Sequence, residues 1–119
     1  MKSIAFIFSH APHGTSFGRE GLDIILSASL TIQDISIFFI GDGVFQLVKN
    51  QQPEIILSRN YASAFCILPL YGINKFYFYS DSLIERGFLE KDIFLLDIQI
   101  LNTYVFQEKL SQCEGIINF

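Results

Sequence analysis

The sequence has few cysteines, few charged residues and no long hydrophobic run. Its two cysteines, Cys66 and Cys113, stand far apart and form no C-x-x-C motif, so neither a disulfide framework nor a zinc knuckle is expected. No apolar stretch approaches the roughly 20 residues that a membrane-spanning helix needs. The N-terminal apolar run lacks the small-residue cleavage site of a signal peptide. We therefore expect one cytoplasmic domain, residues 1–119, with no membrane segment.

The composition is acidic and unusually apolar. Twelve Asp and Glu against eight Lys and Arg give a net charge of −4, which argues against direct nucleic-acid binding. Half of the residues are hydrophobic and only 17% are charged, against roughly 25% in an ordinary soluble domain. A small domain cannot bury so much apolar surface by itself, so hydrophobic side chains are expected on the outside, covered by partner subunits.

The pattern of apolar runs and turn residues predicts alternating strands and helices. Short apolar runs predict five strands, at Ser3–Ser9, Ile35–Ile40, Lys75–Tyr79, Ile93–Leu96 and Ile116–Phe119. Between them, helices are predicted from Gly18-Arg19-Glu20 onward, over Ser58–Leu70, from Ser80 or Asp81 to Arg86, and from Asn102 to about Cys113. Near-continuous apolar strands that alternate with helices indicate an α/β fold. We expect a mostly parallel five-stranded sheet with helices on both faces, in flavodoxin-like layers.

Capping and breaking residues set the predicted helix ends. Pro69 and Gly72 are expected to stop the second helix, and Ser80 or Asp81 to cap the third. Asn102 is the predicted N-cap of the last helix, and Gly115 its stop.

The loop between the first strand and the first helix holds the densest group of candidate site residues: Ser9, His13, Gly14, Gly18 and Arg19. Ligands of open α/β sheets bind at such strand ends. The loop is nevertheless not a phosphate-binding P-loop, because its two glycines are one residue too close and arginine replaces the lysine. A turn that sets the first helix on the sheet explains the same residues, so a binding crevice and a purely structural turn both remain open.

The sequence has no motif typical of a metal site or of a serine nucleophile. The only histidines are His10 and His13, and a metal would need Asp23 or Asp42 beside them. No G-x-S-x-G elbow is present, which disfavours a serine hydrolase. We therefore expect no metal, no cofactor and no catalytic residue in this chain.

Both cysteines have structural explanations. Cys66 lies among apolar residues of the predicted second helix, where burial would raise its pKa and make it inert. Cys113 lies near the end of the last helix, where the helix dipole disfavours a thiolate.

Three motifs carry a resemblance to a known family: F-I-F-S-H-A-P-H-G-T-S-F-G-R-E-G-L-D at 6–23, F-F-I-G-D-G-V-F-Q-L at 38–47 and S-L-I-E-R-G at 82–87. Together they resemble the DsrE/DsrF-like family, and within it the DsrF-like subunits of bacterial sulfurtransferase complexes of the TusBCD type. The resemblance implies a heterohexamer of two heterotrimers, with TusB-like and TusD-like subunits as partners. It also implies a sulfur relay from a TusA-like donor to a TusE-like acceptor, for 2-thiolation of the tRNA wobble uridine.

The family's sulfur-carrying cysteine belongs to the TusD-type subunit, at the end of the strand before the short helix. Here that position falls on Phe78 or Tyr79, neither of which can hold a persulfide. The resemblance therefore implies a non-carrier subunit, part of a sulfurtransferase complex but without a catalytic cysteine of its own. Two alternatives remain: an independent small-ligand or phosphate-binding domain that uses the Ser9–Gly18 loop, and a thiol enzyme that uses Cys66 or Cys113.

Overall fold

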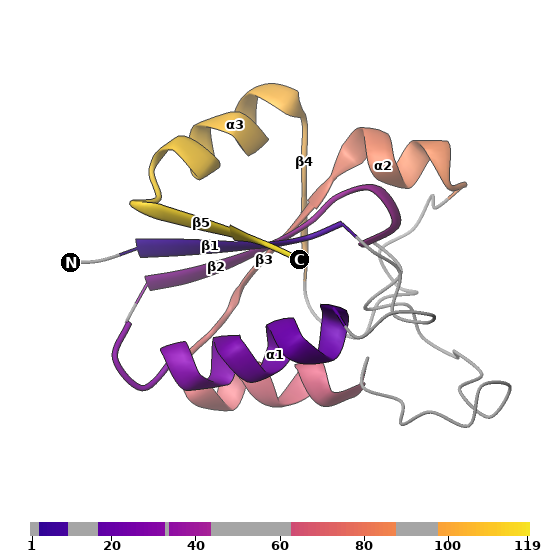
Figure 1. Ribbon diagram of the computed structural model, residues 1–119. Helices are drawn as coiled ribbons and strands as arrows, with labels where there is room; N and C mark the ends of the chain where they lie inside the picture. Colours follow the sequence, from indigo (N-terminus) through magenta and orange to yellow (C-terminus); the bar gives the residue numbers. More distant parts are fainter. Residues whose placement is uncertain (1–2, 10–16, 33, 44–62, 88–97) are drawn as a thin grey trace, which may run out of the picture.

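Five parallel strands form a single sheet in the order β4-β3-β2-β1-β5 (Figure 1). This computed structural model describes residues 3–9, 17–32, 34–43, 63–87 and 98–119. The strands are β1 (Ser3–Phe8), β2 (Asp34–Phe39), β3 (Lys75–Tyr79), β4 (Gln99–Leu101) and β5 (Gly115–Asn118). The predicted α/β fold with a five-stranded sheet is confirmed, and all four strand pairings are parallel.

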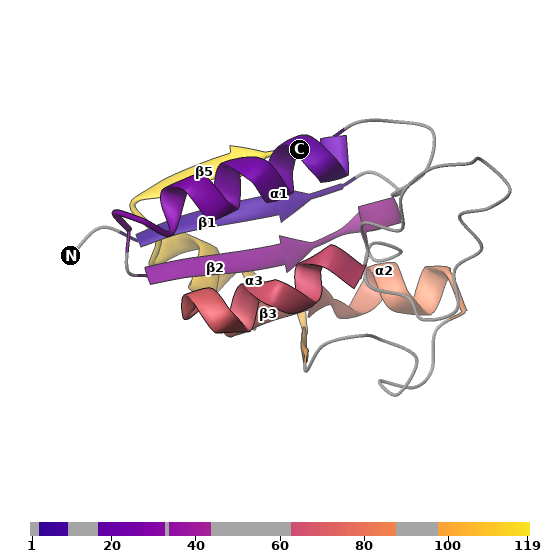
Figure 2. The same cartoon turned by 90° about the horizontal axis from the view of Figure 1, so that it is seen from below.

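Helices cover both faces of the sheet, as predicted. The helical elements are α1 (Phe17–Ala28), the 3₁₀ helix η3 (Ser63–Tyr71), α2 (Ser80–Glu85) and α3 (Thr103–Ser111). Figures 1 and 2 show α1 and η3 side by side on one face and α3 on the other. The chain steps from β1 to β2 to β3 in one direction, whereas from β4 it returns to β5 at the opposite edge. Because parallel crossovers are right-handed, the reversed step places α3 on the opposite face.

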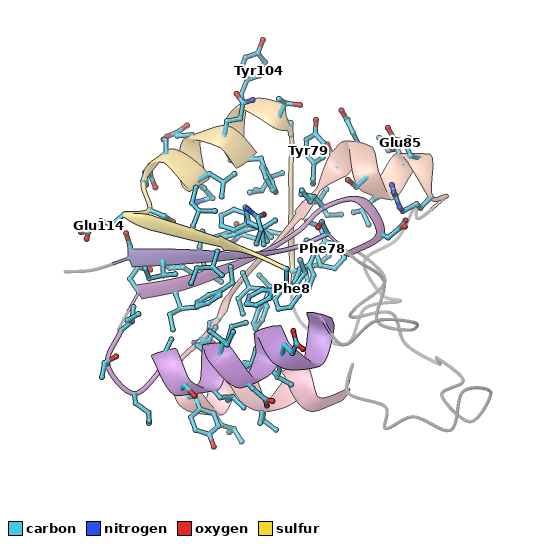
Figure 3. All side chains as sticks on the ribbon, viewed as in Figure 1. Phe8, Phe78, Tyr79, Glu85, Tyr104 and Glu114 are labelled. Atoms are coloured by element: carbon cyan, nitrogen blue, oxygen red, sulfur yellow. The ribbon has the colours of Figure 1, made fainter. Side chains whose placement is uncertain are left out.

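The alternation of side chains along the strands divides the core in two. The α1-side cluster includes Phe6, Phe8, Ile37, Phe39, Phe76 and Phe78 from the strands, with Leu22, Ile25, Leu68 and Leu83 from the helices. The α3-side cluster consists of Ala5, Ile7, Phe38, Tyr77, Leu101 and Phe106. Figure 3 shows Phe8 and Phe78 between the sheet and the lower helices. Burial on both faces explains why these strands have near-continuous apolar sequences.

The predicted second helix is only partly correct. Residues 58–62 lie outside the described part of the chain, and the helix over Ser63–Tyr71 is 3₁₀ rather than α. Pro69 lies inside it and does not stop it. The helix ends at Tyr71, and the chain turns at Gly72 with a φ of 84°, a left-handed conformation that glycine adopts without strain.

Other predicted boundaries also shift. Neither Ser80 nor Asp81 caps α2: its N-cap is Tyr79, with no side-chain capping bond. The N-cap of α3 is Asn102 as predicted, and its side chain accepts a hydrogen bond from the Val105 N–H at 3.0 Å. Gly115 does not end that helix but begins β5.

The fourth strand of the described sheet comprises residues that were not predicted to form a strand. Residues 93–96 lie outside the described part of the chain, and the fourth strand of the sheet is Gln99–Leu101. Apolar periodicity locates a run of strand-forming residues but does not define which of them pair with the neighbouring strand.

The described surface is rich in apolar side chains, as the composition predicted. The exposed large hydrophobic residues are Ile24, Leu30, Ile67, Leu70, Tyr71, Ile84, Ile100, Tyr104, Ile116 and Ile117. They lie on both helical faces and at both edges of the sheet, so more than one surface could be covered by another protein. Within the described ranges, no helix is both long and apolar enough to cross a bilayer.

Candidate functional site

A pocket of about 280 Å³ opens at the carboxyl ends of β2, β3 and β4. Its lining residues are Ile40, Gly41, Tyr79, Ser82, Thr103, Phe106 and Gln107. The chain leaves β3 into α2, whose Leu83 joins the α1-side cluster. It leaves β4 into α3, whose Phe106 joins the α3-side cluster. The two helices diverge to opposite faces, and this divergence opens a crevice of the kind where α/β sheets bind ligands.

A tyrosine hydroxyl connects the two helices at the mouth of the pocket. The Tyr79 hydroxyl donates to Asp81 Oδ2 at 3.0 Å and lies 2.8 Å from Thr103 Oγ1. Since its proton goes to the carboxylate, the Thr103 hydroxyl is the donor in the second bond. Figure 3 shows Tyr79 between α3 and α2. The start of α2 is thereby fixed against the start of α3.

The turn after β2 forms another wall of the pocket. Gly41 has a φ of 53° and its N–H donates to Ser82 Oγ at 2.9 Å. The half-buried Arg86 guanidinium donates to Asp42 Oδ1 at 3.0 Å and to the Ser82 carbonyl at 3.1 Å. Gly43 packs directly on the Phe8 backbone. These contacts hold the turn rigidly over α2.

The described lining of the pocket is apolar and carries hydroxyl groups. Its walls include the rings of Tyr79 and Phe106 and the side chain of Ile40. The hydroxyl-bearing residues Ser82 and Thr103 also line it. Among the described residues, the lining has no thiol, imidazole or charged group. In the described ranges, no three His, Cys, Asp or Glu side chains gather as a metal site would require. Such a pocket can hold a ligand that has an apolar part and a polar atom able to hydrogen-bond to these hydroxyls.

Of the loop residues predicted as a site, the structure describes only Ser9 and the helix positions of Gly18 and Arg19. Ser9 binds the far end of β5, because its N–H donates to the Phe119 carbonyl at 2.9 Å and its hydroxyl to the same oxygen at 3.1 Å. Gly18 and Arg19 lie in the first turn of α1, and the Arg19 side chain is outside the description. His13 and Gly14 lie outside the described residues altogether.

The pocket residues were missed by sequence reasoning. Tyr79 and Thr103 stand at or just after the ends of their strands, where carboxyl ends of parallel strands meet at one edge. Hydroxyl side chains at successive strand ends were the available signal. This signal could not be used for Thr103, because no strand was predicted to end just before it.

The structure distinguishes the two positions at which the family's carrier cysteine could fall. Phe78 is fully buried in the α1-side cluster. Tyr79, by contrast, is half-buried and lines the pocket. Successive residues of a strand point to opposite faces, so only one of the pair can face the crevice. At this position the chain has a phenol ring instead of a thiol.

Cys113, whose side chain is described, lacks the features of an activated nucleophile. Cys113 is half-buried, and its thiol lies 3.5 Å from the Lys109 carbonyl as a donor. Burial, and secondarily the Asp34 carboxylate, raise the pKa of the Cys113 thiol above its ordinary value. The thiol is therefore protonated at neutral pH and poorly nucleophilic. The Cys66 side chain lies outside the described residues.

The sequence was compared with protein families and with known proteins. Residues 2–119 match the DsrE/DsrF-like family. The chain belongs to that family. Protein TusC of Buchnera aphidicola subsp. Acyrthosiphon pisum (strain 5A) is 57% identical over 119 residues, covering 100% of both chains. The TusC homolog of Aliivibrio fischeri is 48% identical over the same 119 residues, again covering 100% of both.

Solved structures share the DsrE/DsrF-like fold at low identity. The YchN protein of E. coli superposes with a TM-score of 0.81 at 16% identity, and the two chains are covered over 100% of their lengths. MTH1491 of Methanobacterium thermoautotrophicum gives 0.71 at 13% identity, also over 100% of both chains. At this identity the likeness concerns the fold alone.

Proposed function

We propose that this chain is the non-carrier subunit of a sulfur-relay complex of the TusBCD type. The complex passes persulfide sulfur from a TusA-like donor toward a TusE-like acceptor for 2-thiolation of the tRNA wobble uridine. Full-length identity of 48–57% to TusC proteins supports the subunit type. The observation that carries the non-carrier role is Tyr79, which occupies the pocket-facing position at the end of β3.

The partners in this proposal are TusB-like and TusD-like subunits, in a cytoplasmic heterohexamer of two heterotrimers. The apolar surface supports such partners. Leu30, Leu70 and Tyr104 are each more than 80% exposed, at 81%, 85% and 84%. Proteins that act as monomers expose such side chains singly, in scattered positions. In a subunit of a complex, exposed apolar side chains are buried against partner subunits on assembly.

The proposal predicts that both cysteines are dispensable for sulfur transfer. Cells that depend on the assembly should keep normal tRNA 2-thiolation when the chain has Cys66→Ser and Cys113→Ser, because neither residue occupies the carrier position. Thiolated uridine is measured by mass spectrometry of tRNA digests, after native mass spectrometry shows that the TusB-like and TusD-like subunits still co-purify. A matched substitution of the TusD-like subunit's carrier cysteine is the positive control. Loss of thiolation in a fully assembled double variant would overturn the non-carrier role.

A second candidate is a small-ligand-binding domain that uses the Ser9–Gly18 loop or the neighbouring strand ends. The observation in its favour is the pocket at the ends of β2, β3 and β4. A small ligand that raises the melting temperature of the chain without its partners, and loses this effect in Tyr79→Ala, would favour it. In the proposed relay subunit, only partner subunits stabilise the chain.

A further inference from the structure

One edge of the sheet is formed by β5, and its outer side is open in the described structure. No strand lies beyond β5 among the described residues (Figure 2). Both ends of β5 are fixed to β1. The Glu114 N–H donates to the Ser3 carbonyl at 2.9 Å, and the Phe119 N–H to the Ile7 carbonyl at 2.7 Å. This edge is therefore a rigid, preformed strand.

The hydrogen bonds of Phe119 determine which backbone groups point outward. The Phe119 N–H donates to the Ile7 carbonyl, and the Phe119 carbonyl accepts from the Ser9 N–H. Both backbone groups of Phe119 therefore point toward β1. Only alternate residues of a parallel strand bond to a given neighbour. Glu114 precedes β5 and is not part of this alternation. Within β5, Ile117 shares the parity of Phe119, whereas Ile116 and Asn118 direct their N–H and C=O groups away from β1.

This edge lacks the features by which proteins prevent strand pairing. Exposed edges are usually very short, or contain lysine or proline. β5 has neither a charged residue nor a proline, and Ile116 and Ile117 are 50% and 39% exposed. The opposite edge, β4, has only three residues. Of the two edges described, β5 is the one suited to receiving another strand.

The side of α1 beside β5 is apolar as well. Ile117 pairs in register with Phe6, so its side chain lies on the α1 face of the sheet. A Cβ at Gly21 would meet the Phe8 ring at 2.5 Å and the Phe119 ring at 3.0 Å, so this side of α1 lies over β1 and the residue that follows β5. Ile24 and Ala28 follow Gly21 at helical spacing on that side, and Ile24 is 44% exposed.

We propose that β5 pairs antiparallel with β5 of a second copy of this chain, about a twofold axis at Ile117. Ile116 of each copy then exchanges both backbone hydrogen bonds with Asn118 of the other, and the two Ile117 side chains meet as a non-hydrogen-bonded pair. The two sheets become one continuous sheet. Because this register follows from the parity of β5, it does not depend on the proposed function.

Two observations favour a second copy as the occupant. The outward groups at positions 116 and 118 satisfy one another under twofold symmetry, which is the commonest symmetry of protein dimers. No charged side chain lies within the paired residues, so identical strands meet without repulsion. A four-residue strand alone buries less than the roughly 1,000 Å² expected of a stable interface. Ile24 and Ala28 of both copies, flanking the Ile117 pair, add apolar area.

Site-specific disulfide formation tests the register. In a Cys66→Ser, Cys113→Ser background, Ile117→Cys is expected to give a covalent dimer of two 13.6 kDa chains when diamide oxidises the thiols. Non-hydrogen-bonded partners have Cα atoms about 4.5 Å apart, within the range of a disulfide. The matched control is Ile116→Cys, which lies opposite Asn118 and too far from its own copy to bridge. Ile100→Cys on β4 is the control for the other edge. A dimer yield at least about fivefold above both controls is expected.

Equal cross-linking at all three positions, or none at position 117, would overturn the proposal. So would a cross-link from position 117 to a different subunit of the co-expressed assembly.

A proline variant with the native cysteines provides an independent test. Asn118→Pro removes an outward N–H but leaves the bonds of Phe119 to β1 in place, and edge strands tolerate proline. Two differently tagged copies, co-expressed with or without other subunits, are expected to co-purify in the wild-type chain and to lose at least about tenfold of that recovery in Asn118→Pro. Unchanged recovery would contradict the proposal. Because copies are counted directly, the result stands even if no relay complex forms.

Discussion

Gly43→Ala is expected to destabilise the chain by at least about 3 kcal/mol. A Cβ at this position would overlap the Phe8 carbonyl oxygen, lie 2.5 Å from its carbonyl carbon and 3.1 Å from the Ser9 nitrogen. These atoms belong to the backbone at the end of β1, a central strand, so the contact cannot be relieved by rotating a side chain. The β2 turn and the wall of the pocket that it forms should be lost together.

Pulse proteolysis across a urea series at submicromolar concentration measures this change while limiting self-association. The matched control is Gly72→Ala, where φ is 84° and no atom lies within 4 Å of the added Cβ. Gly72→Ala should lower the free energy of unfolding by about 1–2 kcal/mol, because only the left-handed backbone conformation is unfavourable for alanine. If Gly43→Ala lowers the urea midpoint of unfolding no more than Gly72→Ala does, the turn after β2 does not pack closely on β1.

Phe38→Ala is expected to cost about 3–5 kcal/mol, as for other large-to-small changes in a protein core. Phe38 is fully buried, and its ring centroid lies 5.0 Å from the ring of Tyr77 and 5.0 Å from the ring of Phe106. It is the central ring between the sheet and α3. Removing it leaves a cavity under α3, so the positions of Thr103 and Phe106 in the pocket should also loosen.

The control for this substitution is Tyr104→Ala, on the same helix. Tyr104 is 84% exposed and points away from the sheet (Figure 3). Its replacement should change the unfolding free energy by no more than about 0.5 kcal/mol. Equal urea midpoints for the two variants would show that α3 does not rest on Phe38.

The apolar pattern of the sequence was sufficient for the fold class. Runs such as Ile35–Ile40 and Lys75–Tyr79 are too short and too β-branched or aromatic for helices, and their separation leaves room for parallel crossovers. The Asn102 cap was also predictable, because a side chain that accepts a hydrogen bond from the first turn acts locally.

Long-range packing decided the other features. Pro69 was read as a stop, yet η3 continues through it. The packing of Leu68 in the α1-side core outweighs the local preference. The strand Gln99–Leu101 is defined by its pairing with β3, which no local pattern encodes.

The sequence by itself determined the layered α/β architecture and the apolar surface, because both depend on residue type or local spacing. Only the tertiary structure decided that Tyr79 rather than Phe78 faces the pocket, and that Tyr79 meets Thr103 there at 2.8 Å. These two residues are 24 positions apart. They become neighbours only when β3 and β4 pair in register and the helices that follow them diverge to opposite faces of the sheet.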